Sequence, residues 1–278
     1  MKRLQYDPLI LEYNPVESPL LDFKSECILS AKKIASKNIE NRPIALAMSG
    51  GVDSELMAQS FLEAGIPFFA AIGRYTTAVG DFVNKHDFVY AEDWCKAHSV
   101  DIIYVDLDIY NQASLLCEYA LSARGFSPQY ACHMYIFKWC SDNGYFFVAS
   151  NGEFRLMLRG NQYVTGHTQI VMALNNFCQL HALKGETHFL RQDARMVLSF
   201  LELPTTKRLM SERYHDIHPH RYECYNDVFN FVTRPKYTGF EHVQEWDARL
   251  RNPMKLVMGK YNKMVYTSLD YLKSLLGK

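Results

Sequence analysis

Residues 44–73 read IALAMSGGVDSELMAQSFLEAGIPFFAAIG, and this stretch decides the fold class. The apolar segment 44–48 predicts a buried strand, the helical spacing of apolar residues over 54–65 predicts a helix that Gly65 ends, and segment 67–73 predicts a second strand. Strands that are apolar throughout and alternate with helices are typical of a parallel sheet covered on both faces. The stretch therefore predicts an α/β fold.

The alternation continues along the chain, with helices expected at 86–98 and 112–126 and strands at 101–109 and 145–150. Beyond Phe154 we find no further strand pattern, and helical spacing is seen at 169–183, at 189–203 and from 267 onward. We expect a doubly wound parallel sheet followed by a C-terminal mainly helical region. The expected parts are an N-terminal extension and helix (1–41), an α/β domain (42–155) and a helical region (156–278).

Composition excludes several classes of protein. Apolar residues make up 48% of the 278 residues, and 30 basic residues balance 30 acidic ones, so no global positive field attracts nucleic acid. The N-terminal residues carry charges and prolines where a secretory signal has an apolar segment, and no stretch approaches the roughly 20 apolar residues of a membrane span. Seven cysteines without a CxxC pair indicate reduced thiols. We expect a cytoplasmic protein with no membrane or disulfide-linked partner.

The loop SGGVDS, residues 49–54, lies between the first predicted strand and the following helix. Ligands of open α/β sheets bind at the carboxyl ends of strands, where a helix N-terminus offers N–H groups to an anion. Adjacent glycines let the backbone approach phosphate oxygens closely. Asp53 beside a polyanion calls for a bridging cation, for which Mg²⁺ is the simplest choice. A plain Gly-Gly turn with a helix cap is the alternative.

This loop resembles the signature of the PP-loop ATP pyrophosphatases, and among them the asparagine synthetase-type amide ligases are the most similar branch. The resemblance implies that ATP and Mg²⁺ are bound, that the β,γ-pyrophosphate is held by the loop, and that AMP and pyrophosphate are released through an adenylated intermediate. The nucleotide-binding residues it implies are Ser49, Gly50, Gly51, Val52, Asp53 and Ser54, with Asp53 also catalytic and a metal ligand. Neither GxxxxGK[ST] nor GxGxxG occurs in the chain.

Two further strand ends supply candidate residues. The segment ASNGE at 149–153 partly matches the glycine- and acid-rich loop of the asparagine synthetase branch. Asn151 and Gly152 would then contact the nucleotide and Glu153 would share Mg²⁺ with Asp53, whereas the alternative is a simple turn. Arg74 follows the second strand and is expected either over the nucleotide or on the surface.

Departing pyrophosphate needs cations directed at the charge that develops on it. The segment RPKYTGFE at 234–241 has the proline and glycine of a fixed loop, so we assign Arg234 and Lys236 as catalytic cations. A solvated surface loop is the alternative, and Lys207 and Arg208 are the next candidates.

The acceptor of the adenylate is not identified by the sequence. We expect a carboxylate or carbonyl oxygen of a small molecule or RNA, attacked by a nitrogen nucleophile that ammonia, an amine or a separate subunit provides. Sulfur transfer of the tRNA thiolase kind is an alternative, because Cys132 and Lys138 faintly resemble a catalytic pair of some thiolases. Cys132 also fits a buried helix face. A nucleotide binder similar to the sulfonucleotide reductases is a third reading.

Overall fold

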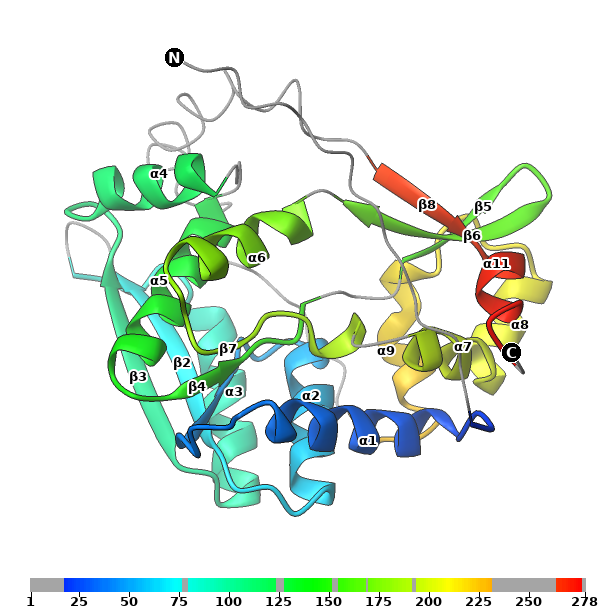
Figure 1. Ribbon diagram of the computed structural model, residues 1–278, viewed down its shortest axis with the longest axis horizontal. Helices are drawn as coiled ribbons and strands as arrows, with labels where there is room; N and C mark the ends of the chain where they lie inside the picture. The colour runs from blue at the N-terminus through cyan, green and yellow to red at the C-terminus, as the bar shows by residue number, and fades with distance from the viewer. Residues whose placement is uncertain are drawn as a thin grey trace.

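A parallel five-stranded sheet forms the centre of the computed structural model, which describes residues 18–76, 80–123, 128–151, 155–168, 170–191, 194–231 and 264–276. Its strand order is β3-β2-β1-β4-β7 (Figure 1). The strands are β1 (Ile44–Ala47), β2 (Phe69–Thr76), β3 (Ile102–Asp108), β4 (Phe146–Val148) and β7 (Gly185–Glu186). All their pairings are parallel. The predicted α/β class is confirmed.

Helices cover both faces of this sheet because its strands are apolar on both sides. In β1, Ile44 and Leu46 join the core beneath one set of helices, whereas Ala45 joins the core beneath the other. The first set is α1 (Phe23–Ser36), α2 (Val52–Glu63) and α3 (Lys85–His98), and the second is α4 (Ala113–Ser122), α5 (Pro128–Asp142) and α6 (Ile170–Leu180). The predicted doubly wound arrangement is therefore correct. Within the described ranges, no helix combines the length and apolarity that crossing a bilayer requires.

The C-terminal region is mainly helical, as expected, but the expectation that strands end near Phe154 is wrong. Its helices are α7 (Ala194–Leu201), α8 (Pro204–Ser211), α9 (Arg221–Tyr225) and α11 (Leu269–Lys273), with 3₁₀ turns η1 (Phe189–Arg191) and η2 (His218–His220). A second, antiparallel sheet has the order β5-β6-β8 and contains β5 (Leu156–Arg159), β6 (Gln162–Thr168) and β8 (Met264–Ser268). The predicted helix from 267 thus begins as a strand.

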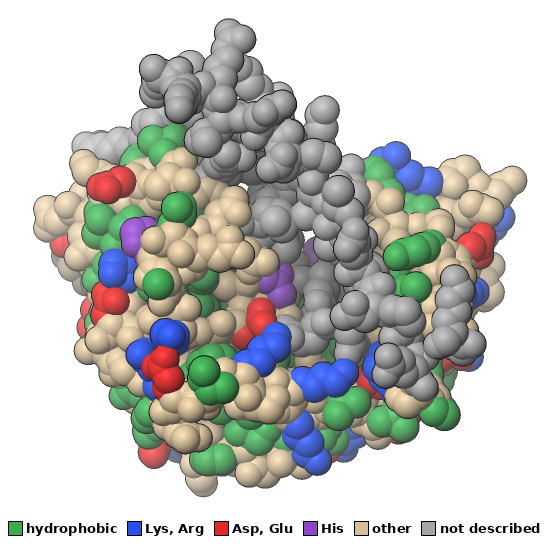
Figure 2. Space-filling model, in the orientation of Figure 1, with side chains coloured by type: hydrophobic (Ala, Val, Ile, Leu, Met, Phe, Trp, Pro, Cys, Tyr) green, Lys and Arg blue, Asp and Glu red, His purple; other side chains and the backbone are tan. Residues whose placement is uncertain are grey.

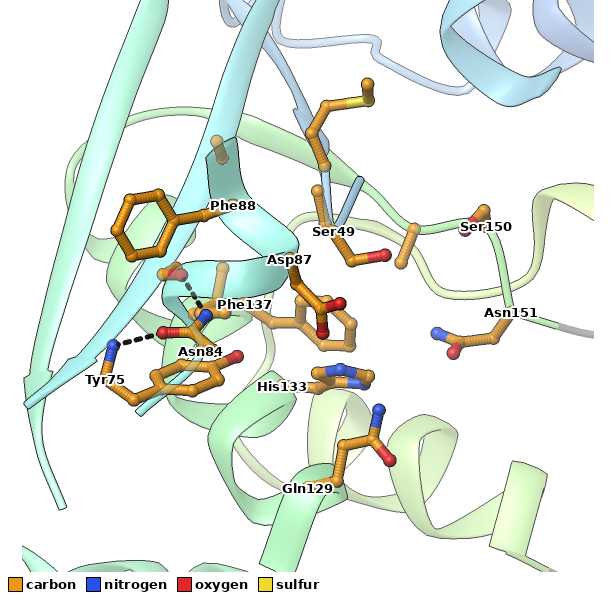
Figure 3. A pocket seen from close by; sticks show the side chains of 16 residues that line it. Ser49, Tyr75, Asn84, Asp87, Phe88, Gln129, His133, Phe137, Ser150 and Asn151 are labelled. Atoms are coloured by element: carbon orange, nitrogen blue, oxygen red, sulfur yellow. Dashed lines mark hydrogen bonds between the residues drawn. The ribbon is translucent and has the colours of Figure 1, made fainter. Parts of the chain in front are cut away.

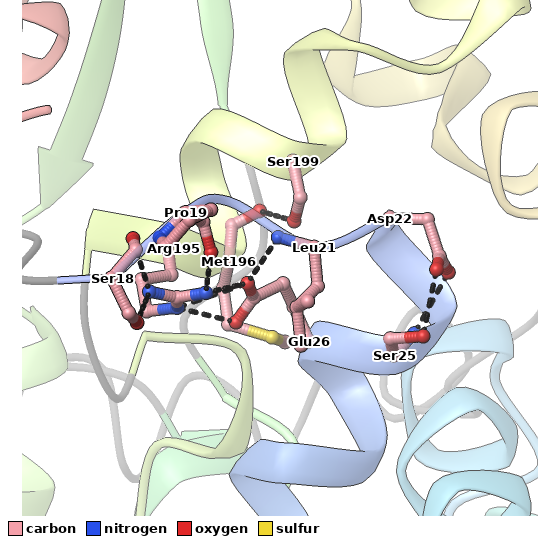
Figure 4. Close-up of polar contacts among 9 residues, drawn as sticks. All are labelled: Ser18, Pro19, Leu21, Asp22, Ser25, Glu26, Arg195, Met196 and Ser199. Atoms are coloured by element: carbon pink, nitrogen blue, oxygen red, sulfur yellow. Dashed lines mark hydrogen bonds and ion pairs between the residues drawn. The ribbon is translucent and has the colours of Figure 1, made fainter.

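Two sets of side-chain contacts connect the first helix to the C-terminal half. Buried Glu26 of α1 accepts hydrogen bonds from Arg195 of α7 at 2.6–2.9 Å, and Arg195 also donates to the carbonyl oxygens of Ser18 and Pro19 (Figure 4). Because both charges are buried and fully bonded, removing one partner of such a pair typically costs about 3–5 kcal/mol.

The second set of contacts between the first helix and the C-terminal half is aromatic. Phe23 of α1 stacks on Tyr225 of α9 with ring centroids 5.8 Å apart, and it meets Phe200 of α7 edge-on at 5.7 Å. All three side chains belong to the same core as β1 and α2. One apolar core therefore crosses the expected boundaries at 41/42 and 155/156.

Candidate functional site

The loop 49–54 leaves β1 at the carboxyl edge of the sheet and leads directly into α2. Gly50 has φ +71°, and a Cβ there would lie 2.3 Å from the carbonyl oxygen of Asp87 in α3. The left-handed conformation and the close approach of α3 both require glycine at this position. Only a glycine lets the loop turn beneath the start of α3.

The N-terminus of α2 is available to an anion. Gly51 is its N-cap and has no side chain that could accept a hydrogen bond from the N–H groups of the first turn. The hydroxyl of Ser54 donates to the carbonyl oxygen of Gly51 at 2.7 Å and accepts from the backbone N–H of Ser49 at 3.3 Å. Ser54 therefore holds the loop closed.

Asp53, the acidic residue of the loop, forms an ion pair that the sequence did not predict. Arg221 of α9 donates from Nε to both carboxylate oxygens at 3.1 and 2.9 Å, and a second guanidinium nitrogen lies 2.9 Å from Asp53 Oδ2. The hydroxyl of Tyr225 donates to Asp53 Oδ1 at 3.0 Å. Helix α9, from the C-terminal half of the chain, thus contacts loop 49–54 directly.

A histidine, His218, and a second arginine, Arg155, lie on the Arg221 side of this ion pair. His218 lies beside Arg221 and Arg155, and burial, followed by the charge of Arg221, lowers the pKa of His218 to about 4. The Nε of Arg155 is buried and has no hydrogen-bond partner within the described part of the chain. A buried N–H donor without a partner costs free energy, and an anion bound here would remove that cost. Arg221 thus contacts the loop directly, and Arg155 lies near His218, whose carbonyl oxygen accepts from Arg221.

Asp53, the one of the two predicted metal ligands that the structure describes, is already paired with a cationic side chain. Both oxygens of Asp53 already accept bonds from Arg221, so a guanidinium occupies the position that the cation would take. Glu153, the second predicted ligand, lies outside the described residues. The described ranges contain no group of three or more His, Cys, Asp or Glu side chains that could hold a metal ion.

A pocket opens beside the loop at the carboxyl ends of β1, β2 and β4. Figure 3 shows Ser49 on one side of it and, on the other, Tyr75 and Asn84, with Asp87 and His133 pointing toward one another across it. Its volume is about 70 Å³, well below the roughly 300–1,000 Å³ of pockets that hold small ligands. Side chains would have to move before a whole nucleotide entered. On a wider scale the molecule is hollowed near the middle of the face that Figure 2 shows, where charged and histidine side chains gather.

Asn151 lines the same pocket from the end of β4. Its side-chain amide donates to the carbonyl oxygen of Thr187 at 3.0 Å, and the Thr187 hydroxyl is hydrogen-bonded to both Asn175 and His188. Burial lowers the pKa of His188 to about 4, so this imidazole is neutral at pH 7. Asn151 is thus held in the pocket wall by a buried polar network, and Gly152, predicted beside it, lies outside the described residues.

Three solved structures are similar in arrangement to the chain at low identity. A U34-tRNA thiolase, NcsA, from Methanococcus maripaludis with its 4Fe-4S cluster has a TM-score of 0.35 and 11% identity, covering 89% of both chains. An NMN synthetase from Francisella tularensis has a TM-score of 0.34 and 11% identity, covering 84% of this chain and 94% of that one. An NH3-dependent NAD synthetase from Campylobacter jejuni, in complex with nitrate, has a TM-score of 0.30 and 12% identity, covering 87% and 97%. No protein-family model matches the sequence, and no curated protein matches it.

Arg74, predicted over the nucleotide or at the surface, faces away from the pocket. Side chains alternate along β2, so Gly73 and Tyr75 line the pocket while Arg74 lies on the other side of the sheet. There it pairs with both carboxylate oxygens of Asp106 at 2.7 and 2.8 Å and stacks over Tyr104 at 4.0 Å. Its placement matches the surface alternative.

Of the other predicted cations, the structure describes Lys207 and Arg208. Arg234 and Lys236 lie outside the described residues. Lys207 pairs with Glu202 at 2.6 Å and Arg208 with Glu212 at 3.1 Å, and all four of these side chains are well exposed. The sequence analysis missed Arg155 and Arg221, because the polar cluster HPHR at 218–221 does not indicate which of its side chains meets Asp53.

Cys132 and Lys138 do not form a reactive pair. Cys132 is fully buried in the core of α5, and burial raises the pKa of its thiol far above the usual range. Lys138 lies at the surface and pairs with Asp142 at 2.9 Å. A thiol held protonated in an apolar core is a poor nucleophile, so Cys132 behaves as a core residue.

Proposed function

We propose that the chain binds ATP at loop 49–54 and cleaves it between the α- and β-phosphates, releasing AMP and pyrophosphate. The observation that carries the proposal is the N-terminus of α2, without a capping side chain, at the carboxyl edge of a parallel sheet, next to a pocket and to Arg221. Backbone N–H groups and a helix dipole bind phosphate, and a pocket beside them would take the nucleoside.

In the proposed reaction an oxygen of the acceptor attacks the α-phosphorus, and the bond from that phosphorus to the bridging oxygen breaks. Pyrophosphate leaves with its negative charge, which Arg221 and Arg155 stabilise at the loop. Asp53 orients Arg221 through its carboxylate. We keep Mg²⁺ as the proposed companion of ATP, with no role for Asp53 as its ligand while Arg221 is bonded there.

The second half of the proposed reaction is attack on the adenylate by a nitrogen nucleophile. The acceptor would be a small molecule or RNA, and ammonia, an amine or a separate subunit would supply the nitrogen. Burial of Cys132 favours nitrogen over a sulfur carried on this cysteine. Sulfur transfer with a sulfur atom from elsewhere is the second candidate.

The test is product analysis with ATP labelled at the α- and γ-phosphates, in the presence of carboxylates, amines and RNA. The proposal expects labelled AMP and labelled pyrophosphate. Arg221→Ala should lower kcat about 100-fold or more, the usual effect of removing a group that stabilises developing charge, while the Kd of ATP changes little. Arg208→Ala is the matched control and should leave both constants unchanged. ADP and orthophosphate as the main products would contradict the proposal.

A further inference from the structure

Strand β3 forms one outer edge of the central sheet, because within the described part of the chain it pairs with β2 alone (Figure 1). It is seven residues long, whereas β7 at the opposite edge has two. Proteins usually protect an open edge with a short strand, a bulge, a lysine, a proline or a covering helix. The sequence of β3, IIYVDLD, contains neither lysine nor proline, and its register with β2 runs without a bulge. This edge is therefore able to pair with another strand.

The hydrogen bonds to β2 show which backbone groups of β3 face outward. Ala70 N donates to Asp101 O at 2.8 Å at one end of the ladder, and Ile109 N donates to Thr76 O at 3.4 Å at the other. Because the direction of the backbone groups alternates along a strand, the odd-numbered residues of β3 face β2. The N–H and C=O groups that face outward, and that accept or donate no hydrogen bond in the described chain, belong to residues 102, 104 and 106.

The charge at the middle of this edge is already paired within the chain. Arg74 of β2 donates to both carboxylate oxygens of Asp106 at 2.7 and 2.8 Å, and its guanidinium lies 4.0 Å from the ring centre of Tyr104. Tyr104 is 39% exposed and the side chain of Asp106 is 57% exposed. A carboxylate that an arginine neutralises repels an approaching strand less than a bare carboxylate does. The edge is thus accessible and carries no unpaired charge at its centre.

The side-chain pattern of β3 is symmetric about Val105. Apolar Ile103, Val105 and Leu107 alternate with Tyr104 and Asp106, so the pattern is the same in both directions along the strand. In an antiparallel pair of two copies with a two-fold axis at Val105, Tyr104 lies opposite Asp106 of the other copy. On the other face, Ile103 lies opposite Leu107. Apolar side chains then meet apolar ones, and no carboxylate lies directly opposite a carboxylate.

We propose that two copies of the chain associate through β3, antiparallel and in register about Val105, so that their central sheets join into one. Tyr104 N donates to Asp106 O of the other copy, and Asp106 N donates to Tyr104 O of the other copy. The two-fold axis doubles these bonds. Each pair of Arg74 and Asp106 lies beside the Tyr104 ring of the other copy, and both copies contribute the same residues to the interface. The inference rests on the sheet edge and is independent of the proposed ATP chemistry.

The experiment is size-exclusion chromatography with light scattering over a range of protein concentrations. The wild type should have twice the 32.2 kDa mass of one chain. Tyr104→Pro removes an N–H that faces away from β2, so the chain keeps its own ladder. The pairing loses two hydrogen bonds, and the Kd of self-association should rise about tenfold or more. Tyr104→Lys places a lysine on the edge and should also weaken the dimer.

The matched control is Tyr271→Lys. Tyr271 is exposed to a similar degree, 42%, and lies in α11 on the opposite side of the molecule (Figure 1). This variant should have the mass of the wild type at every concentration.

Oxidative cross-linking tests the register of the two strands. In the proposed pair the two Val105 Cα atoms lie about 4.5 Å apart, within the range that a disulfide spans. Val105→Cys should therefore form a covalent dimer. Leu107→Cys is the control, because Leu107 is as fully buried as Val105 and on the same face, but lies opposite Ile103 of the other copy. It should cross-link no more than the wild type.

A wild type with the mass of one chain at every concentration would overturn the inference. So would a dimer that neither Tyr104 variant weakens, or one that Val105→Cys does not cross-link. If Tyr104→Pro does not fold, Tyr104→Lys and the cross-link decide. A monomer that forms AMP and pyrophosphate would leave the proposed function standing, whereas a β3-linked dimer that forms neither would refute that function alone.

Discussion

Replacement of Arg221 by methionine should destabilise the protein far more when Asp53 is present than when it is absent. Methionine keeps an unbranched apolar stem but removes the guanidinium, which leaves the Asp53 carboxylate with a hydrogen bond from the hydroxyl of Tyr225. The side chains of Asp53 and Arg221 are only 12% and 20% exposed, so water replaces the lost bonds incompletely.

The magnitude follows from this burial. Breaking a fully buried ion pair costs about 3–5 kcal/mol, and the partial exposure with one remaining hydroxyl bond reduces this to about 2–3 kcal/mol for Arg221→Met. Asp53→Asn removes the charge, so the double variant Asp53→Asn/Arg221→Met contains no unpaired ion. We expect the double variant to lose about 1–2 kcal/mol, less than Arg221→Met alone.

The assay is urea unfolding of the wild type, both single variants and the double variant, with equal m-values as the condition for comparing free energies. Arg208→Met is the control, because its pair with Glu212 is exposed and such pairs are worth about 0.5 kcal/mol or less. A coupling free energy below about 0.5 kcal/mol between Asp53 and Arg221 would refute the reasoning.

Three further outcomes are expected. Gly50→Ala should lower the free energy of unfolding by more than Gly65→Ala, since both positions have positive φ (+71° and +68°), yet only at Gly50 would a Cβ clash, 2.3 Å from Asp87 O. Equal losses in urea unfolding would show that α3 moves aside. Burial lowers the pKa of His188 from 6.5 to about 4, so the unfolded chain binds more protons between these values and stability should fall as the pH drops through that window. Between these two pH values, the free energy of unfolding of His188→Gln should decrease by on the order of 3 kcal/mol less than that of the wild type. An unchanged pH profile of stability would show that His188 does not cause the decrease. Cys132→Ala should keep most of the ATP cleavage, and loss of activity in a folded variant would favour sulfur transfer.

The central sheet and the loop at its edge were predictable because local pattern alone specifies them. Continuous apolar segments marked β1, β2 and β4, and the glycines lay where a strand meets a helix. The hairpin of β5 and β6 was missed although Gly160, with φ +59°, and Asn161 form a two-residue turn that signals a hairpin. Alternation along β2 would also have assigned Arg74 to the face away from Tyr75.

The partners of Asp53 were not predictable from local pattern. Arg221 is 168 residues away in the chain, and it is brought to the loop only by the packing of α9. Nothing in the spacing of residues 218–225 distinguishes an arginine that meets a carboxylate from one that meets solvent. Asn84 was missed for the same reason, because its side-chain bonds to Tyr75 N and Gly73 O depend on how far β2 extends beyond the end of β1.

The stack of Phe23 on Tyr225 limits which segments of the gene can be exchanged by recombination. Tyr225 touches the first helix through its ring and Asp53 through its hydroxyl. A gene fragment encoding only residues 42–155 would keep Asp53 but lose Phe23 and Tyr225, and it would leave apolar surface on α2 uncovered. Recombination that moved this segment into another protein would transfer the loop without the residues that shape it. The N-terminal helix, the segment that carries loop 49–54 and α9 are thus expected to have evolved as one unit, with changes in any of them compensated in the others.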